Sequence, residues 1–170
     1  MPRASSAPRY PVRFAAHGFA TDQWRLLTQL PAEIMIATIA LQEDGPRRTV
    51  AEGLAGLDAI AAGRGSDSDL VRAVVAAIYS EPEDDRPDQA PLPDRPQERR
   101  SGVLADCRRV ADILRGGADP ADAAAYRHWI QQVAVRVFGA ARSGGVLGLT
   151  GETVRPVERE FLDDLAAALS

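Results

Sequence analysis

Apolar residues recur along this chain at intervals of three and four, the spacing that places side chains on one face of an α-helix. Thr21 is the expected N-cap of the first such segment and predicts a helix that starts at Asp22. Its apolar positions are Trp24, Leu27 and Leu30. Pro31 either kinks this helix or opens a new one. Residues 30–41 are apolar on nearly every side, which is typical of a buried helix.

Two further amphipathic helices are predicted before residue 82. One follows Thr49, a possible cap, and ends near Gly63, whereas residues 66–69 (SDSD) start the other. The apolar face of the first helix consists of Val50, Leu54, Leu57 and Ile60. The apolar stripe of the second helix consists of Leu70, Val74, Ala77 and Ile78.

Three more helices are predicted after residue 96. The first, over 97–115, is stopped by two glycines at 116–117. Asp119 then supplies an N-cap and Pro120 a first helical residue for the longest helix, which ends at 143–145 (SGG). Pro156 and Glu158 open the last helix. The apolar positions of these helices are Val103, Cys107, Val110 and Leu114; then Tyr126, Trp129, Ile130, Val133, Val137 and Ala140; then Phe161, Leu162, Leu165 and Ala168.

These segments predict an all-α bundle of about six helices with one long Pro-rich linker. Residues 1–20 are expected to form an extended tail, held near Trp24 by Phe14 and Phe19. A single helical domain is predicted over 21–170, with N-terminal helices in 21–81 and C-terminal helices in 97–170. Five prolines and several acids make residues 82–96 an acidic, extended linker, which serves as a spacer or as a docking strip.

Composition narrows the classes of function. The 170 residues include 45% hydrophobic and 26% charged residues, which is typical of a globular chain, and the net charge of −4 disfavours nucleic acid as a partner. There is no lysine, so Schiff-base chemistry and the Walker A phosphate loop are excluded. One cysteine and two histidines cannot form an internal disulfide or a closed structural zinc site. We expect no cofactor and no bound metal.

The sequence gives little indication of a membrane-spanning segment or of a secretory signal peptide. The most apolar stretch, Leu30 to Leu41, is shorter than the roughly 20 residues that a membrane span needs. Prolines at 2, 8 and 11 interrupt the run that a secretory signal would require. A cytoplasmic protein without a membrane span is therefore expected.

No complete catalytic set is found. His128 has no second ligand one turn later, and Cys107 lies on an apolar helical face, which predicts a packed core thiol. Glu33 is either a buried carboxylate with a raised pKa or a first-turn carboxylate after Pro31, and we favour the second interpretation. Three arginine pairs, at 47–48, 99–100 and 108–109, are expected to be solvated.

The glycine-rich loop over 143–151 (SGGVLGLTG) contains three unexplained apolar residues, Val146, Leu147 and Leu149. Because glycines here follow a helix, they indicate a helix end rather than a phosphate loop. The three apolar side chains either tuck into the bundle or form a patch for a partner. They are the candidate partner-binding residues of the sequence.

Residues 126–169 carry a set of short motifs. They are Tyr126-x-x-Trp129-Ile130, Val133-Ala134, Gly144-Gly145-Val146-Leu147-Gly148 and Gly151-x-x-Val154-x-x-x-Glu158. This quarter of the chain resembles a group of uncharacterised bacterial helical proteins and is distantly similar to TerB-like (tellurite-resistance) domains. That resemblance implies a stress protein that binds a small ligand or a divalent ion through Glu152, Glu158 and neighbouring acids. Thr150 stands where those domains place an acid.

We therefore expect a non-enzymatic helical module that binds protein, as a homo-oligomer or within a larger bacterial assembly. The alternative is the small-ligand or divalent-metal-binding stress protein that the TerB-like resemblance implies. An enzyme with Glu33 or His128 as its base is the third hypothesis.

Overall fold

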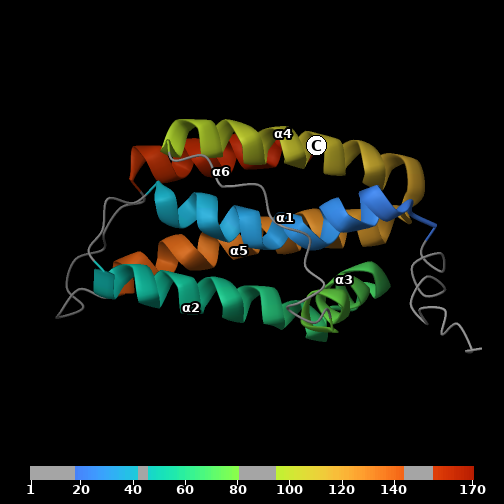
Figure 1. Cartoon of the computed structure of the whole chain (residues 1–170), viewed down its shortest axis with the longest axis horizontal. Helices are drawn as coiled ribbons and strands as arrows, with labels where there is room; N and C mark the ends of the chain where they lie inside the picture. The colour runs from blue at the N-terminus through green and yellow to red at the C-terminus, as the bar shows by residue number, and fades with distance from the viewer. Residues whose placement is uncertain (1–17, 42–45, 81–94, 144–154) are drawn as a thin grey trace, which may run out of the picture.

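The computed structural model describes residues 18–41, 46–80, 95–143 and 155–170, and within these ranges it contains six α-helices and no strand (Figure 1). The helices are α1 (Thr21–Ala40), α2 (Pro46–Ala62), α3 (Asp69–Ser80), α4 (Pro96–Gly117), α5 (Pro120–Ser143) and α6 (Pro156–Ala168), and a 3-10 turn, η2 (Gly63–Gly65), follows α2. The predicted all-α bundle is confirmed.

Helices α1 and α5 lie side by side at the centre of the bundle. Helices α4 and α6 pack together on one side of this pair, and α2 and α3 cover the other side (Figure 1). Helix α2 contacts α5 most extensively and also contacts α1, and it forms an outer edge of the molecule.

Two helix starts follow the predicted capping chemistry and one does not. A carboxylate oxygen of Asp119 accepts a hydrogen bond from the N–H of Ala121 (2.8 Å), and Ser68 Oγ accepts one from the N–H of Val71 (3.2 Å). Helix α1, however, is capped at Ala20, whose N–H donates to the side chain of Gln23 (3.0 Å). The N-cap predicted at Thr21 was therefore wrong by one residue, because Gln23 supplies the acceptor.

Pro31 lies inside α1, which continues through it, so of the two predicted outcomes, a kink or a new helix, the new helix is excluded. Proline has no N–H to donate to the carbonyl of Leu27 one turn earlier. Tyr126 of α5 donates its hydroxyl hydrogen to that carbonyl instead, over 2.8 Å. The hydrogen bond that the proline removes within the helix is replaced from a neighbouring helix.

The linker predicted over 82–96 ends earlier than expected, because Arg95 is the N-cap of α4 and Pro96 is its first residue. Residues 81–94 lie outside the described part of the chain. Helices on both sides of this segment contribute to one hydrophobic core. Its fully buried members include Leu27, Leu30, Ile34, Val71, Val74, Cys107, Val110, Leu114, Tyr126, Ile130, Phe161 and Leu165.

The core confirms the packed position of Cys107, which has no exposed surface. It also confirms that Phe19 lies near Trp24: the two rings stack with centroids 6.4 Å apart. Phe14, the other aromatic residue expected to hold the tail, lies outside the described residues.

Candidate functional site

Helix α2 distributes its side chains in an unusual way. Its inner face buries Glu52 completely, together with Gly56, Ala59 and Ile60. Three large aliphatic side chains point outward instead. Val50 is 63% exposed, Leu54 59% and Leu57 49%. The single apolar face predicted for residues 50–60 is therefore divided: Ile60 belongs to the core and the other three residues face solvent.

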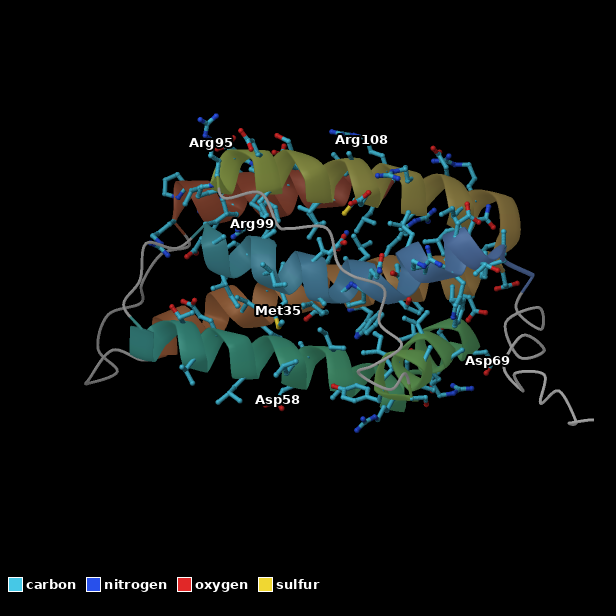
Figure 2. All side chains as sticks on the ribbon, in the orientation of Figure 1. Met35, Asp58, Asp69, Arg95, Arg99 and Arg108 are labelled. Atoms are coloured by element: carbon cyan, nitrogen blue, oxygen red, sulfur yellow. The ribbon has the colours of Figure 1, made fainter. Side chains whose placement is uncertain are left out.

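Two glycines explain why the aliphatic residues face outward. A Cβ atom at Gly56 would lie 2.5 Å from Cγ of Met35 and 3.1 Å from Cγ2 of Val137. A Cβ at Gly63 would lie 2.9 Å from Nε1 of Trp129. The inner face of α2 thus approaches α1 and α5 too closely for a leucine. Met35 points into this contact in Figure 2.

A hydrogen bond holds α2 in this rotation. Trp129 of α5 donates its indole N–H to the carbonyl of Ala59, over 3.2 Å. Ala59 lies in the last turn of α2. The bond anchors the end of α2 with Ala59 turned inward and Leu57 turned outward.

We define the outer face of α2 by its exposed residues from 50 to 62, of which Asp58 alone is charged. They are Val50, Ala51, Leu54, Leu57, Asp58 and Ala62. In Figure 2 the side chain of Asp58 points away from the bundle. Other exposed helix surfaces carry ion pairs, such as Arg115–Asp112 on α4 and an Arg72–Asp69 pair on α3. The outer face of α2 is therefore the described surface that most resembles an interface.

A second feature is a group of polar side chains between α1 and α4. Because α1 does not restart at Pro31, Glu33 lies in the middle of a helix, and the first-turn position favoured for it was wrong. Burial, and then the nearby Asp106, raise the pKa of Glu33, while Arg109 opposes this shift. Its Oε2 atom is buried and makes no hydrogen bond to the described residues.

Cys107 lies in the same region, and its thiol is not activated as a nucleophile. Burial, with the negative charges of Asp106 and Glu33 nearby, raises the pKa of its thiol to about 12. A thiol with this pKa carries almost no thiolate at neutral pH, and the thiolate is the nucleophilic form. Within the described ranges, no cluster of three or more His, Cys, Asp or Glu side chains is placed to hold a metal ion.

The remaining predicted chemical residues lie apart from one another. His128 is exposed on α5. Arg100 is not solvated as expected: it donates to Asp164 (2.6 Å) and Glu160 (2.9 Å) and thereby ties α4 to α6. Figure 2 shows Arg108 and Arg95 pointing outward from α4, whereas Arg99 is directed toward α1.

Glu158, a candidate ligand in the TerB-like interpretation, caps its own helix. Its carboxylate is buried and accepts hydrogen bonds from the backbone N–H (3.2 Å) and from Nε (3.0 Å) of Arg155. Both carboxylate oxygens therefore already have donors. The loop candidates Val146, Leu147 and Leu149, and also Glu152, lie outside the described residues.

Comparisons with protein-family models, with curated proteins and with solved structures find no match to this chain. The resemblance of residues 126–169 to TerB-like domains accordingly stays a prediction. None of the helices in the described ranges combines the length and the apolar character that crossing a membrane requires.

Proposed function

We propose that this protein is a non-enzymatic helical module that binds protein through the outer face of α2, as a homo-oligomer or as a component of a larger assembly. The observation that supports this function is the distribution of side chains on α2, which places a glutamate and a glycine inward and three aliphatic residues outward. A helix that buries Glu52 and Gly56 while it exposes Val50, Leu54 and Leu57 gains little from these three aliphatic side chains in the isolated chain. A partner helix covering these side chains would remove them from water, which is the main favourable term in protein association.

The alternative of an ion- or ligand-binding stress protein has less support. Glu158, the described residue on which it depends, already accepts two hydrogen bonds from Arg155. An enzyme has no assembled centre in the described ranges, where His128 is exposed on α5 and Glu33 lies between α1 and α4. Neither alternative is favoured by a specific contact.

Photo-crosslinking in the native cell tests the proposed function. A photoreactive phenylalanine analogue is placed at Leu54 or, as a control, at Val135, an exposed aliphatic position on α5 (39% exposed). We expect protein adducts from position 54 and few from position 135. Equal or absent adducts at the two positions would overturn the proposed function.

The variants Leu54→Arg and Val135→Arg provide a matched check on folding. Both positions are exposed, so each change should alter the free energy of unfolding of the monomer by no more than about 0.5 kcal/mol. Circular dichroism and urea unfolding measure this directly. A loss of adducts with Leu54→Arg can then be assigned to the surface and not to unfolding.

A further inference from the structure

We propose that the occupant of the outer face of α2 is the same face of a second copy of this chain, paired antiparallel about a two-fold axis that passes near Leu54. This inference rests on the proposed function and names its partner. It follows from the length and spacing of the apolar stripe, from its symmetry and from its charges.

The stripe has the geometry of a helix-pairing seam. Val50, Leu54 and Leu57 follow one another at intervals of four and three residues, the spacing that brings knobs of one helix into holes of another. Helix α2 has 17 residues, and at the usual rise it is about 25 Å long. The apolar stripe on α2 is about two turns long. It therefore fits another apolar helical stripe of that length, and α2 of a second copy provides one.

The stripe is also self-complementary. Leu54 lies at its middle, so an antiparallel pair with its axis near Leu54 sets Leu54 beside its own counterpart and Val50 beside the partner's Leu57. Closed two-fold pairs of this kind, in which one patch meets itself, are the commonest form of soluble oligomer. Helix α2 lies at an outer edge of the bundle, where a second copy has access (Figure 1).

The charges favour the antiparallel orientation. Asp58 is the one charged residue of the outer face. In an antiparallel pair centred near Leu54, the Asp58 positions of the two copies lie about two helical turns apart. A parallel pair would instead place Asp58 beside Asp58, which is repulsive.

The area of the outer face of α2 determines how tightly the dimer is expected to bind. Stable interfaces bury about 800 Å² on each partner, which three aliphatic side chains and their small neighbours reach only with help from adjacent surface. A reversible dimer with a dissociation constant of micromolar order is therefore expected. Sedimentation of the full chain over a range up to about 100 µM covers this affinity.

Sedimentation of the variants tests the surface. We expect Leu54→Arg to weaken the dimer by about 30-fold or more, because a charge would be buried at the centre of the interface. Val135→Arg should sediment as the wild-type chain does. A wild-type monomer throughout the range, or a dimer indifferent to Leu54→Arg, would overturn the inference.

Two further variants test the orientation. In a mixture of Val50→Cys and Leu57→Cys chains, mild oxidation should link unlike chains if the pair is antiparallel, whereas a parallel pair would link like chains. With Leu54→Cys, two thiols meet near the axis, where a disulfide needs Cβ atoms about 3.5–4.5 Å apart. Because Cys107 is fully buried, only the introduced thiol is available for mild oxidation. We expect a disulfide-linked dimer from Leu54→Cys and none from Val135→Cys; the reverse result would contradict the two-fold axis.

Failure of this inference is distinguishable from failure of the proposed function. If the purified chain is monomeric but position 54 forms adducts with a different protein in the cell, the second copy is rejected and the interaction module stands. If position 54 forms no adducts at all and the chain is monomeric, both are rejected.

Discussion

Tyr126 on α5 donates its hydroxyl hydrogen to the backbone carbonyl of Leu27 on α1, over 2.8 Å. Leu27 lies one helical turn before Pro31, so its carbonyl has no N–H partner within α1. Both groups are buried, and an unpaired buried carbonyl is costly. This contact allows α1 to pass through the core with a proline in it.

Tyr126→Phe is therefore expected to lower the free energy of unfolding by about 1–3 kcal/mol, because it leaves the Leu27 carbonyl buried without a donor. Urea unfolding measures the change. In a Pro31→Ala background, residue 31 has an N–H that can bond the carbonyl, so the same substitution should cost less. Equal costs in both backgrounds would show that the hydroxyl does not compensate for the proline.

Gly63→Ala should destabilise the protein by about 1–3 kcal/mol, the usual cost of overpacking. The new Cβ would lie 2.8 Å from Cγ2 of Val75 and 2.9 Å from Nε1 of Trp129, whose N–H is bonded to Ala59. Gly53→Ala is the matched control, since nothing lies within 4 Å of its added Cβ. That control should be stabilising by about 0.5–1 kcal/mol. Thermal or urea unfolding of both variants separates close packing from helix propensity.

Glu33→Gln should raise the free energy of unfolding at neutral pH. The pKa of Glu33 is raised in the folded protein from 4.5 by burial and by Asp106, so its ionised form is disfavoured there. Below about pH 4 the carboxyl is protonated in both states and carries no such penalty. As the pH rises through the folded-state pKa, the wild-type chain should lose stability relative to the variant. Unfolding curves at several pH values check this, and a stability difference independent of pH would contradict it.

Cys107 should resist thiol reagents in the folded protein. With a pKa of about 12, about one thiol in ten thousand is ionised at pH 8, and the side chain has no exposed surface. Labelling should proceed at once in denaturant and only as fast as the chain unfolds in buffer. Val135→Cys supplies an exposed thiol as the positive control. Rapid stoichiometric labelling of native Cys107 would show that the α1–α4 contact opens readily.

Much of the helical framework could be predicted from local patterns. Asp119 and Pro120 mark the start of α5, and the two glycines at 116–117 mark the end of α4, because caps and helix stops depend on a few neighbouring residues. The core position of Cys107 followed from the same periodicity. The candidate surface was not found in this way: the residues predicted for a partner were those of the loop over 143–151, and Val50, Leu54 and Leu57 were assigned to an amphipathic helix.

One signal in the sequence pointed toward the outer face of α2. Gly56 and Ala59 of α2, with Gly63 directly after it, form a row of small residues on the side opposite Leu54 and Ala51. Such a row permits close helix contact, but it does not by itself show which side faces the core. The position of Glu33 was missed for a related reason, since the effect of Pro31 depends on Tyr126, about a hundred residues later in the chain.

The sequence alone determined the class of the fold, because helix periodicity, capping and helix stops are set within a few residues of each position. Tertiary structure decided which side of α2 faces inward and whether α1 continues as one helix through Pro31. Those outcomes depend on the distance between helices and on donors supplied from another helix, which local spacing does not record.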